Sequence, residues 1–260
     1  AQADELLEQT LAAFTRDELL HRGLNKSAVI APVYTQAEAE SRGVFREQFI
    51  VDGVPKMPFQ IYEHDTVKTV QARLRTSVAS ADQPLTGLRC MELCWVWSGP
   101  MIGQILADLG ADVIKVEAPK RFDLYRTRGL EHLSKKMDEK TRVESSLYFH
   151  SLNRNKSGLT LDLKHPKGLD VALRLASESD MLIENFTVGT MERLGLDGGA
   201  LIKANPALVQ MSMSGPGRGS SVETLRSYGL VLSALGGAED LVRNGDEFIG
   251  SPTFSLSDPN

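Results

Sequence analysis

The stretch from residue 88 to residue 117 constrains the fold most, because its pattern changes from strand to helix and back to strand. The pattern predicts one strand over residues 88–94 and a second over residues 112–117. Between these strands, Pro100 lies where a helix would begin and Gly110 where it would end. The stretch therefore predicts a βαβ unit, which is the building block of a parallel sheet.

The same alternation continues towards the carboxyl end of the chain. It predicts an α/β protein, a doubly wound (Rossmann-like) parallel sheet with flanking helices. Residues 119–146 interrupt the pattern with a charged, weakly periodic segment, which we expect to be a long surface excursion. The further strands are expected at 158–163, 180–184 and 207–213, and the helices at 166–178, just after Gly189 and at 198–204.

Ligands of such sheets bind beyond the carboxyl ends of the strands, so the turns at those ends are candidate binding segments. These turns are Cys94–Gly99, Glu117–Arg121, Asn185–Gly189 and Ser214–Gly219. The first turn carries Trp95 and Trp97 next to a Ser-Gly-Pro run, instead of a glycine-rich phosphate loop. This composition favours a stacking platform for a flat ring and disfavours a nicotinamide enzyme.

The amino-terminal third contains several predicted helices and strands but almost no candidate functional residues. An amphipathic helix is predicted over 3–20, a short buried strand over 28–33 and a polar helix over 36–48. Two short extended pieces are expected at 50–54 and 59–62. Residues 77–87, rich in Ser, Ala, Pro and Gly, are expected to be a linker between this block and the α/β region.

Composition excludes several classes of function. The net charge of −5 gives no basic surface for nucleic acid, and no apolar run approaches the roughly 20 residues of a membrane span. The first residues lack the pattern of a signal peptide, and the two cysteines are too few for a disulfide framework. Cys90 and Cys94 are expected to be small buried residues on one face of a strand. With five scattered histidines, we expect no metal site and a cytoplasmic protein without membrane or nucleic-acid partners.

Several motifs, in this order and spacing, resemble the class III CoA-transferases, which include formyl-CoA and carnitine CoA-transferases. The motifs are the Val96–Pro100 turn, LADLGADVIKVE at 106–117, NRNKSGLTLDLKHPKG at 153–168, ENFTVGTMERLGL at 184–196 and NPALVQMSMSGPG at 205–217. The resemblance implies CoA transfer between an acyl-CoA and a carboxylic acid. It implies a CoA thioester as substrate and no permanently bound cofactor.

In that family an aspartate is the nucleophile, beyond a tyrosine segment and a glycine pair. Here the segment contains Tyr228, the pair is Gly236–Gly237, and the matching aspartate is Asp258. A carboxylate can attack an acyl thioester to give an anhydride, and the released CoA thiolate can then form an aspartyl thioester. The resemblance therefore implies that Asp258 is the catalytic residue.

The resemblance also implies the residues that contact CoA. The first turn would line the thioester and pantetheine end, and Asn185 and Phe186 would flank the nucleotide. Ala118 stands where many relatives carry an arginine against the adenine, and Lys120 or Arg121 would substitute as phosphate contacts. The implied CoA-binding residues are Trp95, Val96, Trp97, Ser98, Lys120, Arg121, Arg126, Asn185, Phe186, Arg193 and Tyr228.

Two alternatives stay open. A racemase of the same superfamily needs a histidine at the position of Tyr228, and no histidine follows His165, so this activity is disfavoured. A non-catalytic copy that binds CoA and supports a partner copy is consistent with the departures at Ala118 and Gly229.

The order of the segments suggests a piece of a tandem fusion. Residues 1–76 resemble the carboxyl-terminal portion of one family copy, 77–87 a linker, and 88–260 the amino-terminal CoA-binding portion of a second copy whose small domain is missing. Family members form interlocked dimers. We therefore expect an interlocked dimer or a fused pseudo-dimer with another CoA-transferase copy.

Overall fold

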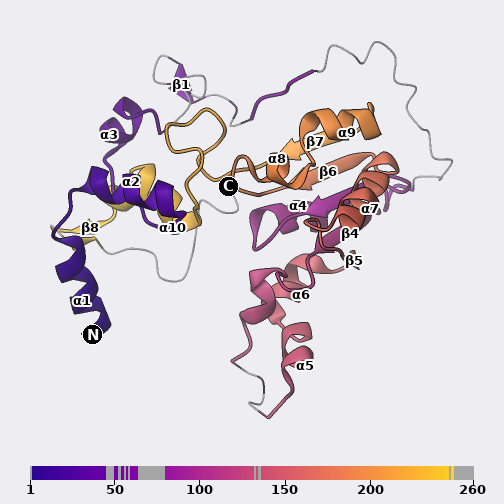
Figure 1. Ribbon diagram of the computed structural model, residues 1–260, viewed down its shortest axis with the longest axis horizontal. Helices are drawn as coiled ribbons and strands as arrows, with labels where there is room; N and C mark the ends of the chain where they lie inside the picture. The colour runs from indigo at the N-terminus through magenta and orange to yellow at the C-terminus, as the bar shows by residue number, and fades with distance from the viewer. Residues whose placement is uncertain are drawn as a thin grey trace. The chain divides into compact units, whose positions relative to one another are not determined.

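A computed structural model describes residues 2–44, 50–51, 54–55, 57, 59–63, 80–131, 133, 136–245 and 247–248. The chain divides into two compact units (Figure 1). Unit 1 combines Ala1–Ile61 with Ser214–Asn260, and unit 2 is Tyr62–Met213. The predicted nucleophile Asp258 and the start of the predicted linker, 77–79, lie outside the described residues. The assignment of the segments to two family copies stays a prediction.

Unit 2 is built on a five-stranded parallel sheet in the order β5-β4-β3-β6-β7 (Figure 1). The first strand along the chain, β3, lies in the centre; β4 and β5 follow on one side, β6 and β7 on the other. This order is the doubly wound topology, which confirms the predicted fold class. The strands are β3 (Arg89–Leu93), β4 (Asp112–Glu117), β5 (Ser157–Thr160), β6 (Met181–Glu184) and β7 (Val209–Ser212).

Helices cover both faces of this sheet. On one face, Met91 and Leu93 of β3 pack in a core with α7, α8 and α9. On the other face, Cys90 and Cys94 pack with α4, as predicted for two small buried residues on one side of a strand. The helices of unit 2 are α4 (Ser98–Asp108), the 3-10 turn η2 (Leu124–Thr127), α5 (Glu139–Glu144), α6 (Leu147–Asn153), α7 (Pro166–Ser177), α8 (Thr190–Leu194) and α9 (Gly198–Ala204).

Local sequence signals explain where several of these helices begin and end. Pro100 lies in the first turn of α4, and Gly110 beyond its end has a φ of +99°, a conformation that glycine adopts at little cost. His165 caps α7, whose first residue is Pro166. The predicted strand at 158–163 is shorter and one residue earlier, because residues 161–165 turn into α7.

Unit 1 brings segments from both ends of the chain into one core. Tyr34 is only 1% exposed, packs among Val222, Leu225 and Leu235, and donates its backbone N–H to the carbonyl of Ala234. The elements of unit 1 are α1 (Gln2–Leu11), α2 (Arg16–Lys26), α3 (Gln36–Ser41), β1 (Ile50–Val51), β2 (Val54–Pro55), α10 (Gly229–Leu235), α11 (Ala238–Leu241), β8 (Arg243–Asn244) and β9 (Glu247–Phe248).

Three sequence predictions in unit 1 differ from the structure. The single helix over 3–20 is two helices, because Thr15 and Glu18 form a capping box that begins α2. The predicted strand at 28–33 has no regular structure: this apolar segment packs against other parts of unit 1 and pairs with no strand among the described residues. The helix predicted over 36–48 ends at Ser41; residues 45–48 lie outside the described residues.

Candidate functional site

The candidate site lies where the sheet order reverses, between β3 and β6. Asn185, which follows β6, joins the two turns there: its side-chain oxygen accepts the N–H of Trp95 at 2.9 Å, and its side-chain nitrogen donates to the Trp95 carbonyl at 2.8 Å. Both polar backbone groups of Trp95 are thus satisfied by one side chain. Because ligands of doubly wound sheets bind at this reversal point, Asn185 fixes the floor of the expected binding crevice.

Aromatic and cationic side chains gather around Trp95. The ring of Phe186 meets the Trp95 ring edge to face, with centroids 6.4 Å apart, and the Arg121 guanidinium lies 5.2 Å from a Trp95 ring centroid. Arg121 reaches this position because residues 118–121 form a tight turn, closed by the Arg121 N–H on the Ala118 carbonyl at 3.1 Å. The structure therefore brings together four of the predicted CoA-binding residues: Trp95, Arg121, Asn185 and Phe186.

The turn after β3 contains an unusual backbone conformation at Val96. Its φ is +69°, in the left-handed region that β-branched residues rarely enter and that costs of order 1–3 kcal/mol. The Val96 N–H donates to a carboxylate oxygen of Asp123 at 3.0 Å. Trp97 is the N-cap residue of α4 and Ser98 is its first residue, so both predicted binding residues lie at the start of this helix.

Helix α4 lies unusually close to β3 because glycines face the strand. A β-carbon at Gly99 would lie 2.5 Å from both Cβ and Sγ of Cys94, and one at Gly103 would lie 1.9 Å from Glu92 Oε2. Unbonded carbon and oxygen atoms do not approach so closely, so both positions require glycine. This close approach places the start of α4 beside the carboxyl end of β3.

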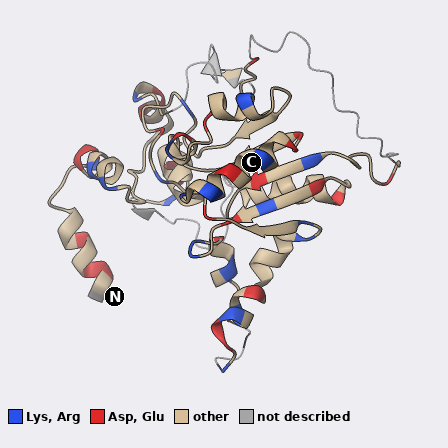
Figure 2. Ribbon diagram, turned by 45° about the vertical axis from the view of Figure 1, so that its right-hand side comes forward, with Lys and Arg blue, Asp and Glu red and all other residues tan. Residues whose placement is uncertain are grey.

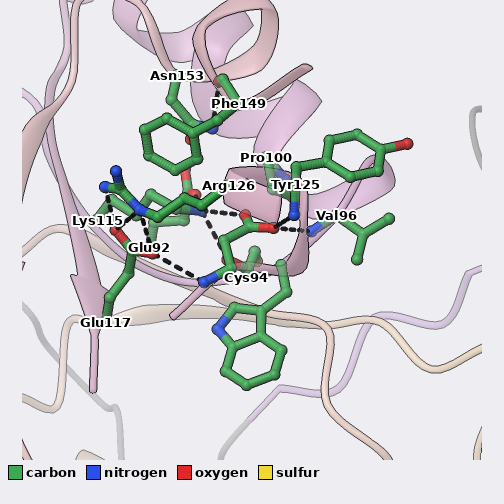
Figure 3. A network of polar contacts seen from close by, with 12 residues as sticks. Glu92, Cys94, Val96, Pro100, Lys115, Glu117, Tyr125, Arg126, Phe149 and Asn153 are labelled. Atoms are coloured by element: carbon green, nitrogen blue, oxygen red, sulfur yellow. Dashed lines mark hydrogen bonds and ion pairs between the residues drawn. The ribbon is translucent and has the colours of Figure 1, made fainter. Parts of the chain in front are cut away.

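A buried network of acidic and basic side chains lies beneath the turn (Figure 3). Glu92 of β3 is opposite Lys115 of β4 in the sheet register, and their Oε1 and Nζ atoms are 3.0 Å apart. Lys156 Nζ lies 2.7 Å from Glu92 Oε2, and Lys115 Nζ lies 3.0 Å from Asp123 Oδ2. These last two contacts are ionic contacts rather than aligned hydrogen bonds. Two acids therefore offset two bases in a site that excludes water.

Arg126 extends the network through a bidentate pair with Glu117. Its Nη2 and Nε atoms donate to the two Glu117 carboxylate oxygens at 2.7 Å and 3.0 Å, and its Nη1 donates to Glu144 at 2.9 Å. The guanidinium also lies 3.6 Å from the Phe149 ring centroid (Figure 3). Glu117 Oε1 in turn accepts the backbone N–H of Asp123. These contacts tie the start of the 119–146 excursion to the end of β4.

The network shifts several ionisation equilibria. Burial by itself lowers the pKa of Lys115, but the attraction of Glu92 and Asp123 outweighs it and raises the pKa. For Lys156 burial prevails over the attraction of Glu92, so its pKa is lowered. Burial raises the pKa of Glu117, yet the hydrogen bonds from Arg126 and the Asp123 N–H prevail and hold it below the usual value.

The cysteines beside this network are not thiolate nucleophiles. Burial, reinforced by the Glu92 charge, raises the pKa of Cys90 to about 12 and that of Cys94 well above its ordinary value. Both side chains are free thiols in the core of unit 2. Their protonated form agrees with the predicted role of small buried residues.

The other predicted residues are distributed more widely. Lys120 is exposed after β4, and exposed Arg193 of α8 donates to the Thr190 hydroxyl at 2.7 Å. Tyr228 belongs to unit 1, where it is 44% exposed and precedes α10. Arg126 is occupied by carboxylates, while Asp258 lies outside the described residues. For Lys120, Arg126, Arg193 and Tyr228 the contact with CoA stays a prediction, as does the catalytic role of Asp258.

Sequence reasoning missed Glu92 and Lys115, the paired charges at the centre of the network. The available signal was a charged residue inside an apolar strand, Glu92 in RCMEL and Lys115 in DVIKVE. Such residues are rarely buried unless they are paired. Lys and Arg are interspersed with Asp and Glu along the elements of unit 2 (Figure 2).

Within the described ranges, no cluster of three or more His, Cys, Asp or Glu side chains is arranged to hold a metal ion. No helix in the same part of the chain is both long and apolar enough to cross a membrane.

The sheet order and the joined turns define a doubly wound α/β domain whose turns after β3 and β6 are linked at the reversal point. A family model described as CoA-transferase family III matches residues 85–253, and the chain belongs to this family. The match begins near β3 and covers the whole α/β region, which confirms the resemblance drawn from the sequence motifs.

Sequence and structural similarity to known proteins agrees with this family membership. The chain is 36% identical over 162 residues to a succinate–glutarate CoA-transferase of Agrobacterium fabrum, covering 62% of this chain and 40% of that protein. It is 40% identical over 154 residues to a formyl-CoA:oxalate CoA-transferase of Bradyrhizobium diazoefficiens, covering 59% and 34%. A crystal structure of a CAIB/BAIF family protein from Brucella suis superposes with a TM-score of 0.60 at 35% identity, covering 68% and 46%. The chain spans less than half the length of these proteins.

Proposed function

We propose that the protein containing this chain transfers CoA between an acyl-CoA thioester and a carboxylic acid, through an aspartyl-CoA thioester on Asp258. Family membership and relatives named as CoA-transferases support the reaction class. The observation that carries the proposal is the pair of hydrogen bonds between Asn185 and Trp95, which joins the turns after β3 and β6 at the reversal of the sheet order, where doubly wound sheets bind their ligands.

CoA would bind over the joined turns, with its thioester and pantetheine end at the turn after β3 and its nucleotide at the turn after β6. Trp95 and Phe186 offer aromatic surfaces for stacking, and Arg121 supplies a cation beside them. Arg121 would supply a cation in the absence of an arginine at Ala118, because the tight turn brings its guanidinium beside Trp95. Since the donors of Arg126 are engaged by Glu117 and Glu144, we assign the phosphate contacts to Lys120, Arg121 and Arg193.

The chemistry would proceed through four acyl transfers. A carboxylate oxygen of Asp258 attacks the acyl carbonyl, the C–S bond breaks, and an aspartyl–acyl anhydride and CoA thiolate form. The thiolate attacks the aspartyl carbonyl of the anhydride, which releases the donor acid and leaves aspartyl-CoA. The acceptor carboxylate then attacks the aspartyl thioester and expels the thiolate. Finally the thiolate attacks the acceptor carbonyl, so that acceptor-CoA forms and the Asp258 carboxylate is restored.

Chemical trapping tests this proposal on the complete protein. Incubation with acyl-CoA and borohydride would reduce an aspartyl thioester to an alcohol, and hydroxylamine would convert it to a hydroxamate. We expect the modified peptide to contain Asp258, and the Asp258→Asn variant to remain unmodified and inactive. Turnover without modification at Asp258 would overturn the proposed intermediate.

The second candidate is a CoA-binding copy without catalysis of its own, which the replacement of the adenine-contacting arginine by Ala118 favours. In that arrangement 1–76 closes one family copy, 88–260 opens the next, and the two form a fused pseudo-dimer or an interlocked dimer. CoA binding by this chain, with trapping confined to another copy, would support this second function. The free thiols of Cys90 and Cys94 suit a reducing compartment such as the cytoplasm.

A further inference from the structure

The three backbone residues that lead out of β3 are each held by a side chain from elsewhere in unit 2. Lys115 Nζ donates to the Cys94 carbonyl at 2.8 Å. Asn185 holds both polar groups of Trp95. Asp123 accepts the Val96 N–H at 3.0 Å. The backbone from Cys94 to Val96 is thus held by three side chains that are themselves buried or half-buried.

Asp123 is the most firmly held of these groups. It is fully buried, and the oxygen that accepts the Val96 N–H also accepts the N–H of Tyr125 at 3.0 Å. Its second oxygen lies 3.0 Å from Lys115 Nζ. Its own backbone N–H donates to Glu117, which the Arg126 guanidinium holds in turn. Both carboxylate oxygens of Asp123 and its backbone N–H therefore have partners within the protein.

The backbone conformation of Val96 requires such a constraint. A valine with a φ of +69° is strained, and a strained residue persists only where its surroundings impose the conformation. The hydrogen bond to Asp123 is such a constraint, and it acts between Trp95 and Trp97. Loss of the bond would let Val96 return to an ordinary conformation and would redirect the chain that leads into Trp97, while Asn185 still holds Trp95.

We propose that Asp123 is a positioning residue of the CoA site, which holds Val96 in the left-handed conformation and thereby orients the turn that receives the thioester end of CoA. This inference rests on the proposed function. It gives Asp123 an inward role, since its carboxylate faces the buried Lys115.

A double-mutant cycle tests the proposal through CoA affinity, measured by calorimetry on the complete protein. Asp123→Ala should weaken CoA binding about tenfold in the otherwise unmodified protein, because Val96 then loses its constraint. In a Val96→Gly background the same change should weaken binding by less than about threefold, since glycine adopts a positive φ freely. The matched control is Asp112→Ala, which removes an acidic residue of an exposed ion pair on β4 and should leave affinity unchanged.

A second measurement needs no variant and covers the case in which Asp123→Ala fails to fold. Hydrogen exchange of the Val96 amide in the unmodified protein should be strongly retarded, because its proton is donated to a buried carboxylate. Rapid exchange of this amide, or equal losses of affinity in both backgrounds, would overturn the positioning role while CoA binding itself persists. Absence of CoA binding by the unmodified protein would instead overturn the proposed function.

Discussion

Replacing Gly103 by alanine should destabilise unit 2 strongly, although alanine favours a helix. The new β-carbon would lie 1.9 Å from Glu92 Oε2, so this oxygen would have to move by about 1 Å. Glu92 is completely buried, and the same oxygen is 2.7 Å from Lys156 Nζ. A shift of that size breaks the pair and leaves a buried charge without its partner.

The magnitude follows from two opposing contributions. Breaking a buried ion pair from one side costs about 3–5 kcal/mol. Alanine in place of glycine inside a helix returns about 1 kcal/mol. The net loss of unfolding free energy should therefore be about 2–4 kcal/mol, a large fraction of the stability of an ordinary domain.

Urea unfolding followed by tryptophan fluorescence measures this loss selectively, because the only two tryptophans of the chain, Trp95 and Trp97, lie in unit 2. Gly198→Ala is the matched control: a β-carbon at this first residue of α9 meets open space, so this variant should be unchanged or slightly more stable. A Gly103→Ala variant as stable as this control would refute the reasoning.

Three further changes have defined outcomes. Asn185→Ala leaves both polar backbone groups of Trp95 without their partner, so unit 2 should lose about 1–3 kcal/mol and CoA affinity should fall together with it in calorimetry. Because the pKa of Glu117 is lowered in the folded protein, its ionised carboxylate stabilises the fold above its unfolded pKa, and this stability is lost as pH falls through the folded pKa. Arg126→Met should therefore move the midpoint of acid unfolding, followed by circular dichroism, to higher pH. An unmoved midpoint would contradict the pairing. Tyr34→Ala should cost unit 1 about 3–5 kcal/mol in thermal unfolding, and a cost below 1 kcal/mol would show that the amino-terminal segment is not part of that core.

The sheet could be predicted because its signals are local. Strand β4 was expected at 112–117 and α9 at 198–204, and both have these bounds. Apolar runs of strand length, separated by helices with proline at the start and glycine at the end, define the order of the elements. The break in the first helix was also present in the sequence, since Thr15 and Glu18 have the spacing of a capping box.

The candidate site was only partly predictable. Trp95, Arg121, Asn185 and Phe186 were expected near one another, because the topology brings the strand-end turns together. The buried network was not, because it depends on non-local register: Glu92 lies opposite Lys115 only when β3 and β4 are aligned as they are here. Nor does any local pattern in the sequence predict the positive φ of Val96, which its distant partner Asp123 supports.

The central claim, CoA transfer through Asp258, is tested most directly by following an oxygen atom. An acceptor acid labelled with heavy-isotope oxygen in its carboxylate should transfer one labelled oxygen to the carboxylate of Asp258 during turnover, because the aspartyl–acceptor anhydride shares that oxygen. Mass spectrometry of the peptide containing Asp258 would detect the label. We predict labelled Asp258 after turnover with acyl-CoA and none without it. Label that appears in the released donor acid while Asp258 stays unlabelled would contradict the account.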